Sequence, residues 1–461
     1  MKILLVNPSS ESVYENSKIK AGVPCSPMLS LATVAASVTP SHDVKIFDAN
    51  IFENPYERLK EDIIIFSPDY LGVTFTTPLF KEMKKSVEIA KGIKPGIITI
   101  AGGAHASSMP RDTLMSSSLD IVVVGEGDFA FSEIVDGQKI ETIKGIFYKK
   151  NGEIIENPPR EQIKDLDILP FPAWGLFDLR KYSSGELLSR KTPAGWLETS
   201  RGCVFGCAYC NKSVFGYNFR VKSASRVVAE IEHMLNAGFK EIHIADDAFT
   251  TNIKRAKDIC ARIIEKGLVF PWATVTGIRI DGVDRELLAL MKKAGCYRVY
   301  YGIESGNQKV LDNIHKGIKL DQVREVVRIS KEEGLEVFGF FMIALPGETE
   351  ATMKDTIKFA KELNLDMAKM SITVPLPATK LYEELKRAGK IKTDDWSKYN
   401  LYSISDIFEH PNLSWDLIEK YYRKFYLEFY FRPSFIVKYA LGALRRGEIF
   451  RDIKYLLDTK W

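Results

Sequence analysis

Cysteine and histidine are scarce in this sequence, with six of each among 461 residues. No apolar run approaches the roughly 20 residues that a helix needs to cross a bilayer, and no secretory leader is recognisable at the N-terminus. These absences argue against a disulfide-stabilised extracellular domain and against a helical membrane protein. We therefore expect a cytoplasmic protein whose thiols stay reduced.

Charge of one sign is also missing, because 64 basic and 60 acidic residues leave a net charge of only +4. A nucleic-acid partner is therefore not expected. With 45% apolar and 27% charged residues, the composition is that of a soluble protein. The chain is longer than one hydrophobic core usually holds, so we expect two domains and a smaller appendage.

Half of the cysteines fall in one short run, Cys203, Cys207 and Cys210, with the spacing C-x3-C-x2-C. Three thiolates on one loop can hold three irons of a cubane cluster and leave the fourth iron open to a substrate. A structural zinc site needs a fourth ligand, and no histidine lies near this loop. Zinc, a disulfide and coincidence remain as minor alternatives. The other thiols are expected to be small buried residues: Cys25, Cys260 and Cys296.

Short apolar strands alternate with helical patterns over residues 1–150. This rhythm predicts an α/β domain with an open, doubly wound parallel sheet. The expected strands are 2–7, 44–48, 70–75, 97–101 and 121–125, and the expected helices are 27–38 and 79–91.

Glycine and polar residues follow several of these strands, at the edge where doubly wound sheets bind ligands. Glycine lets a large ligand approach the backbone closely. No G-x-G-x-x-G pattern is present, so a dinucleotide is not expected, and ordinary strand-to-helix turns remain the alternative. The candidate binding residues are Asn7, Gly102, Gly103, His105, Gly125, Glu126 and Gly127.

A proline-rich stretch over 151–194 predicts an extended linker. A second strand–helix series then runs over 195–377 and predicts six βα units, an open and partial version of the eightfold barrel. Reactive groups of such barrels lie at the carboxyl ends of the strands. The expected strands are 195–199, 239–245, 272–281, 298–306, 336–344 and 368–374.

The cysteine loop, with an aromatic Tyr209 before its last cysteine, resembles the signature of the radical S-adenosylmethionine (SAM) superfamily. The resemblance implies a [4Fe-4S] cluster bound by the three cysteines and cleavage of SAM to a 5′-deoxyadenosyl radical. It also implies oxygen sensitivity and an external reductant such as flavodoxin or ferredoxin. A structural alternative exists for each further residue, such as a helix N-cap for an Asp after a strand. The resemblance assigns SAM contacts to Tyr209, Asp246, Asp247, Arg279, Glu304, Pro346 and Gly347.

The N-terminal third resembles the cobalamin-binding domain found upstream of many radical SAM cores, through the turns after its first, fourth and fifth strands. The D-x-H-x-x-G signature of proteins that ligate cobalt through histidine is absent, and similar radical SAM proteins generally bind the corrin without it. His105 is then expected to be a turn residue near the cofactor tail, with a role as the lower ligand of cobalt as the alternative. Because this region contains only Cys25, a methylthiotransferase with three further cluster cysteines is excluded.

Residues 378–461 are predicted to form a mostly helical appendage. The aromatic-rich segment 414–431 is expected to pack on the open side of the barrel, or alternatively to form an apolar wall for a substrate. The basic amphipathic segment 434–457 would close the domain, although such a helix is also able to make peripheral contact with an anionic membrane.

The resemblance implies a cobalamin-dependent methyltransferase acting on an unactivated carbon of a small molecule, lipid or pigment precursor. Two alternatives stay open. One is radical ring formation, rearrangement or carbon–carbon bond formation without methyl transfer, and the other is a cobalamin or SAM sensor without turnover.

Overall fold

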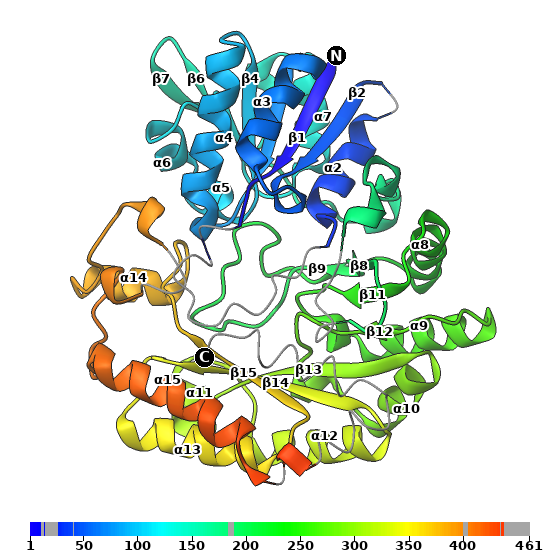
Figure 1. Cartoon of the computed structure of the whole chain (residues 1–461), viewed down its shortest axis with the longest axis vertical. Coiled ribbons are helices and arrows are strands. Elements are labelled where there is room, and N and C mark those ends of the chain that lie inside the picture. Colours follow the sequence, from blue (N-terminus) through cyan, green and yellow to red (C-terminus); the bar gives the residue numbers. More distant parts are fainter. Residues whose placement is uncertain are drawn as a thin grey trace.

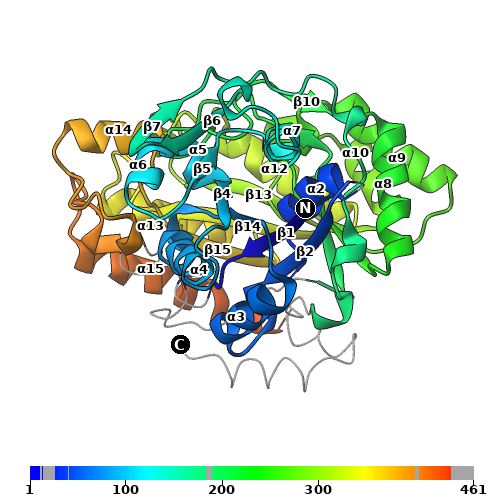
Figure 2. The same ribbon diagram turned by 90° about the horizontal axis from the view of Figure 1, so that it is seen from above.

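A computed structural model describes residues 1–10, 13, 26–39, 41–182, 189–399, 404–433 and 435–437. Two sheets built mainly of parallel strands dominate the described chain, one in the N-terminal α/β domain and one in the half below it in the view of Figure 1. Seen from above, the N-terminal domain lies over the second sheet (Figure 2). The expected class, two successive α/β units with a helical appendage, is confirmed.

The N-terminal sheet has the strand order β2-β1-β3-β4-β5-β6-β7, of which the first five strands are parallel. The order 2-1-3-4-5 is that of a doubly wound sheet, and ligands bind such sheets where the strand order reverses, here between β1 and β3. The strands are β1 (Lys2–Asn7), β2 (Asp43–Asp48), β3 (Tyr70–Thr74), β4 (Ile98–Gly102), β5 (Ile121–Val123), β6 (Ile146–Lys150) and β7 (Glu153–Glu156).

Helices cover both faces of this sheet, and β1 is accordingly apolar from Ile3 to Val6 and buried at every position after its first residue. Ile3 and Leu5 belong to the core beneath α2 and α7, whereas Leu4 and Val6 belong to the core beneath α3 and α4. The antiparallel hairpin β6–β7 was not predicted, and it carries the sheet to Glu156. The helices are α2 (Leu29–Val38), α3 (Pro55–Phe66), α4 (Phe80–Ile93), α5 (Ala104–Ser108), α6 (Pro110–Met115) and α7 (Gly127–Val135).

The second sheet has six parallel strands in the order β15-β14-β13-β12-β11-β8, which is simply the order along the chain. Each strand returns to its neighbour through a helical crossover on the outer side, so the sheet forms the predicted partial barrel (Figure 1). The strands are β8 (Ala194–Leu197), β11 (Glu241–Ile244), β12 (Trp272–Ala273), β13 (Cys296–Glu304), β14 (Glu336–Ile343) and β15 (Met367–Ile372). The helices are α8 (Ala224–Ala237), α9 (Ile253–Glu265), α10 (Arg285–Lys293), α11 (Gln308–Asn313), α12 (Leu320–Glu332) and α13 (Glu350–Glu362).

The appendage contributes α14 (Lys380–Arg387) and α15 (Trp415–Tyr430). Phe425 of α15 packs on Phe341 with ring centroids 5.4 Å apart, so the aromatic stripe is core packing, as expected. The hydroxyl groups of Tyr426 and Tyr430 exchange hydrogen bonds with the backbone of Met370 and Ala368, on the free edge of β15.

Two expectations concern residues that the structure leaves largely undescribed. Of the segment 434–457 only residues 435–437 are described, and Cys25 lies outside the described residues. Cys260 and Cys296 are buried, as expected. None of the helices in the described ranges is long and apolar enough to cross a membrane.

Candidate cofactor site between the two sheets

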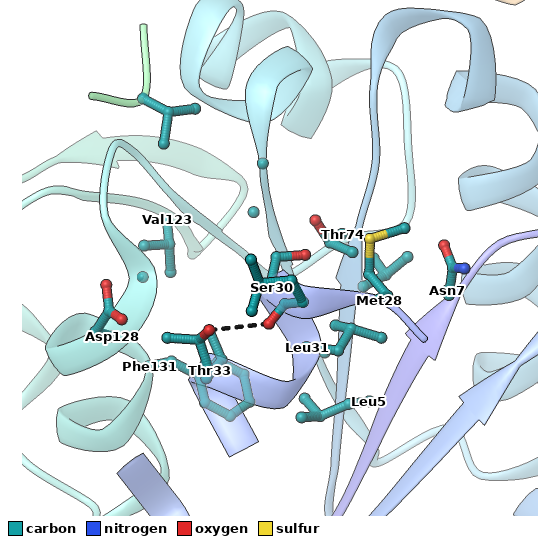
Figure 3. A pocket seen from close by; sticks show the side chains of 18 of the residues that line it. Leu5, Asn7, Met28, Ser30, Leu31, Thr33, Thr74, Val123, Asp128 and Phe131 are labelled. Carbon is teal, nitrogen blue, oxygen red and sulfur yellow. Dashed lines mark hydrogen bonds between the residues drawn. The ribbon is translucent and has the colours of Figure 1, made fainter. Parts of the chain in front are cut away.

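A cavity of about 620 Å³ lies beyond the carboxyl ends of the N-terminal strands. Leu5, Leu31 and Phe131 form part of an apolar wall on the N-terminal side (Figure 3). The opposite side includes Trp196 of β8 and Phe215, which follows the cysteines. The volume falls within the range of small-molecule and cofactor sites. The cavity therefore joins the end of the first sheet to the start of the barrel.

The glycines singled out in the sequence border this cavity. A Cβ atom on Gly102 would meet no atom within 4 Å, so the backbone there faces open space. Gly103 has a φ of +99°, and a Cβ atom would lie 2.9 Å from the carbonyl oxygen of Phe75, so glycine is required. Gly125 and Gly127 line the same cavity. A bulky flat ligand could therefore approach the backbone closely at these glycines.

Asn7 also lines the cavity, and its amide donates a hydrogen bond of 2.9 Å to Asp48. Burial raises the pKa of Asp48, although bonds from Asn50 and Asn7 oppose this effect. The two side chains form a polar patch at the ends of β1 and β2.

His105 departs from its predicted place. It does not border the cavity but is fully buried, with its ring 5.1 Å from that of Phe80 and 5.2 Å from that of Trp396. Its Nδ1 lies 3.0 Å from the Thr77 hydroxyl, and burial lowers its pKa to about 4. A neutral ring inside an aromatic cluster is a packing element. Among the described residues, no histidine lines the cavity.

Glu126, a candidate binding residue, lines the cavity, but its carboxylate is occupied by protein groups. It accepts hydrogen bonds from Arg201 at 2.7 Å and from Arg220 at 2.8 and 2.9 Å. It also accepts one of 3.0 Å from the backbone N–H of Ile163. Glu126 thus joins the N-terminal domain to the barrel and has little capacity left for a ligand.

The cysteine loop occupies the interval between two short paired strands, β9 (Ser200–Arg201) and β10 (Arg220–Val221). Cys203 is buried and Cys210 is solvent-accessible, with Cys207 between these extremes. Partial desolvation raises the pKa of Cys210 to about 11, an effect that nearby Lys212 opposes and to which negative charge on Cys207 or Cys203 would add. The three thiols therefore lie close enough to influence one another.

The described residues contain no group of three His, Cys, Asp or Glu side chains arranged around a single metal ion. A cubane cluster differs in this respect, because each cysteine binds a separate iron.

A buried ion pair stands beside the loop. Lys316 lies 2.7 Å from the Glu304 carboxylate and 3.5 Å from the Tyr209 hydroxyl. Burial, followed by the charge of Glu304, raises the pKa of Tyr209 well above its usual value. The charge of Glu304 is thus neutralised by Lys316. This lysine was not predicted as a site residue, because it follows helix α11 and does not lie at the end of a strand. The pair places the end of β13 against the cysteine loop.

Arg279 also supports the loop. Its guanidinium lies 3.4 Å from the centroid of Phe205, which stands between the first two cysteines. It pairs with Asp281 through two contacts of 2.8 Å and donates to the carbonyl of Lys316 at 3.0 Å. The charge of Arg279 is therefore used in contacts within the protein, including one to the cysteine loop. The sequence had instead predicted a contact between Arg279 and SAM.

The two aspartates after β11 differ sharply. Asp246 is fully buried, and its carboxylate accepts hydrogen bonds from the backbone and hydroxyl of Thr199 and from the hydroxyl of Ser200. Burial raises its pKa. Asp247 is exposed. The predicted SAM contact thus remains open for Asp247, whereas Asp246 fixes the chain that leads into the cysteine loop.

The turn after β14 contains Pro346 and Gly347, as expected. It is held by Glu348, which is fully buried and accepts a 3.0 Å hydrogen bond from the backbone N–H of Leu345. Burial raises the pKa of Glu348 to about 7. This role could not be predicted from the sequence, because a glutamate after a turn is normally exposed.

Comparison with known proteins decides the family. Residues 197–360 match the radical SAM superfamily and residues 22–135 match the B12 binding domain. The chain is 36% identical to the uncharacterized methyltransferase PH0819 of Pyrococcus horikoshii, over 95% of this chain and 94% of that protein. The chain belongs to the cobalamin-binding radical SAM family.

Two further comparisons concern a relative in sequence and a solved structure of similar fold. The chain is 28% identical to an anaerobic magnesium-protoporphyrin IX monomethyl ester cyclase of Rubrivivax gelatinosus, over 87% of this chain and 75% of that protein. It superposes on the cobalamin-dependent SAM radical enzyme OxsB, determined with aqua-cobalamin and SAM bound, with a TM-score of 0.74. That alignment covers 99% of this chain and 72% of OxsB at 18% identity, and it shows a shared fold.

The cofactors of this radical SAM protein are a [4Fe-4S] cluster, SAM and cobalamin. The residues present fit them. The cavity at the ends of β1, β3, β4 and β5 is mostly apolar, bordered by glycine and open at Gly102, which suits a large flat macrocycle. The three neighbouring thiols suit iron.

Proposed function

We propose that this protein methylates an unactivated carbon of a small molecule, a lipid or a pigment precursor. The observation that carries the proposal is the position of the cavity. Residues 214 and 215, which follow the cysteines, form its wall opposite the N-terminal sheet. A group bound in the cavity and a cluster bound by the loop would therefore be neighbours. When bound, the cluster supplies the electron that cleaves SAM, and cobalamin supplies a transferable methyl group.

The chain's own residues would hold these groups in place. Cys203, Cys207 and Cys210 are the proposed iron ligands. Tyr209 and the exposed Asp247 are the proposed side-chain contacts of SAM, with Pro346 and Gly347 bordering its adenine. Gly102, Gly103, Gly125, Gly127 and Asn7 are the proposed boundary of the corrin.

Arg279, Glu304 and Asp246 would act indirectly, because their charged groups already have protein partners. These partners are Phe205 for Arg279, Lys316 for Glu304 and Thr199 for Asp246. An external reductant, flavodoxin or ferredoxin in kind, would deliver the electron.

Metal analysis is the first test. Protein purified without oxygen and reconstituted with iron, sulfide and hydroxocobalamin should contain about four irons and one cobalt per chain. Iron without cobalt would refute the methylation proposal.

Product analysis is the second test. Methylation consumes one SAM as methyl donor and one as radical source, so S-adenosylhomocysteine and 5′-deoxyadenosine should accumulate in equal amounts with a competent substrate. The Cys207→Ala variant is the control and should form no 5′-deoxyadenosine.

The similarity to a cyclase favours one second candidate, radical ring formation without methyl transfer. The same assay separates the two. A cyclase would form 5′-deoxyadenosine with its product and no matching S-adenosylhomocysteine, whereas a sensor without turnover would form neither.

A further inference from the structure

A buried charge cluster ties the base of the cysteine loop to the N-terminal domain. Arg201 contacts three carboxylates at once: Glu126 at 2.7 Å, Asp128 at 2.8 and 3.2 Å, and Glu198 at 2.7 Å. The side chains of Arg201, Glu126 and Asp128 are at most 5% exposed. Each nitrogen of the guanidinium has a carboxylate partner, an arrangement that the single ammonium of lysine could not reproduce.

The loop is closed on itself at the same point. Arg201 in β9 lies opposite Arg220 in β10. Arg220 binds both oxygens of Glu126 and donates to the carbonyl of Ile163 at 2.7 Å. One carboxylate from the N-terminal domain therefore holds both ends of the segment that contains the cysteines.

The charge cluster and the first cysteine are joined by a short and closely packed stretch of backbone. Gly202, the one residue between Arg201 and Cys203, has a φ of +82°. A Cβ atom there would lie 2.3 Å from the carbonyl oxygen of Asn218, so the two sides of the loop are in close contact. A displacement of Arg201 would therefore be passed to Cys203.

The cluster also borders the cavity. Glu126, Asp128, Glu198 and Arg201 are all among its lining residues. Glu126 precedes α7 and Asp128 lies in its first turn, just after β5 of the N-terminal sheet, and Glu198 follows β8 of the barrel. One guanidinium thus bridges the cofactor edge of one sheet and the first strand of the other.

We propose that Arg201, with Arg220, is a positioning residue that sets the distance and orientation between the cysteine loop and the cobalamin cavity. This inference rests on the proposed function. It assigns the charge cluster a geometric role in the reaction, apart from any role in stability. Because a misplacement of about 1 Å can cost about 100-fold in rate, a fixed spacing between two cofactors is functionally significant.

The test uses the full chain loaded with iron, sulfide and cobalamin, in the wild type and in Arg201→Lys. Lysine keeps the charge but cannot bridge three carboxylates. The readouts are iron and cobalt content, the melting temperature, and the magnetic coupling between the reduced cluster and cob(II)alamin in electron paramagnetic resonance. Arg201→Lys should retain both metals, while the coupling falls to less than half of the wild-type value.

Arg160→Lys is the matched control, because Arg160 forms an ion pair with Glu133 of α7 and does not border the cavity. It should leave the coupling unchanged. Should Arg201→Lys fail to bind the metals, Asp128→Asn replaces it, since this variant removes one charge and keeps the side-chain volume. It is expected to lower the coupling with both metals retained.

Two outcomes would overturn the inference. Equal coupling in the wild type and in the loaded variants would refute the positioning role alone. Loss of iron, cobalt and stability together in both Arg201→Lys and Asp128→Asn would reduce the cluster to a folding element. A wild-type protein that binds iron but no cobalt would instead refute the proposed function, and the positioning role with it.

Discussion

Replacing Asp246 by asparagine should destabilise the barrel without acting on SAM directly. The carboxylate accepts three hydrogen bonds, from the backbone and hydroxyl of Thr199 and from the hydroxyl of Ser200. Asparagine can still accept from the Thr199 backbone with its one oxygen, but its NH₂ group would replace the oxygen that accepts from the two hydroxyls. These hydroxyls would then have to accept and would lose the acceptor for their own protons. One bond to a charged acceptor is worth about 1.5–3 kcal/mol, and a buried donor left unpaired costs about 1–3 kcal/mol more.

We therefore expect Asp246→Asn to lose about 3 kcal/mol of unfolding free energy. For a unit of the size of the barrel this corresponds to a melting temperature lower by about 6–12 °C. Asp247→Asn is the matched control at the adjacent, exposed position and should change stability by less than about 0.5 kcal/mol.

Thermal unfolding of both variants, followed by circular dichroism, checks the prediction, together with the affinity for SAM. An Asp246→Asn protein with wild-type stability and weakened SAM binding would refute the structural role and restore the direct contact expected from the sequence. The hydrogen bonds of Asp246 support the loss of stability at position 246. Weakened SAM binding at position 247 would in addition support the proposed contact of Asp247.

Four further results are expected. Cys203→Ser should lose the cluster and all 5′-deoxyadenosine formation, whereas Cys260→Ala, a change at a buried thiol in α9, should keep its iron. Gly102→Phe should fill the open space in the cavity and lower cobalt uptake without loss of iron, as measured by elemental analysis. His105→Phe should retain cobalt, because the ring lies in an aromatic cluster outside the cavity; loss of cobalt alone would restore the ligand hypothesis. Burial raises the pKa of Glu348 from 4.5 to about 7, so its contribution to stability is complete below pH 4.5 and is lost as the pH rises toward 7. Denaturant titrations over this pH range should therefore show that the wild type loses about 3 kcal/mol of unfolding free energy relative to Glu348→Gln.

The elements of the fold could be predicted because each depends on a local pattern. Apolar runs of strand length alternate with segments whose apolar residues recur at helical spacing, and this alternation predicts the two α/β series. The cysteine spacing identifies the loop that follows the first strand of the barrel. The hairpin β6–β7 was missed because lysine and glutamate at its ends weaken the strand pattern.

The roles of charged side chains were less predictable, since they depend on partners distant in sequence. Asp246 and Glu126 lie at strand ends, as site residues do, yet one holds Thr199 and the other holds Arg201. Lys316 acquires its place only when the chain after α11 returns to Glu304. Strand ends gather polar groups near a site, but only the folded arrangement shows which of them remain free.

The tyrosines of α15 have a consequence for how the open barrel avoids association. A closed eightfold barrel has no free strand edges, whereas a six-stranded sheet leaves β15 with backbone groups able to recruit a strand from another molecule. Tyr426 and Tyr430 occupy those groups at Met370 and Ala368, four residues apart on the helix and two apart on the strand. The two hydroxyl groups thereby make the hydrogen bonds to Met370 and Ala368 that a seventh strand would otherwise make. A chain shortened to remove α15 would expose this edge, and intermolecular sheet formation rather than simple loss of activity should be its first symptom.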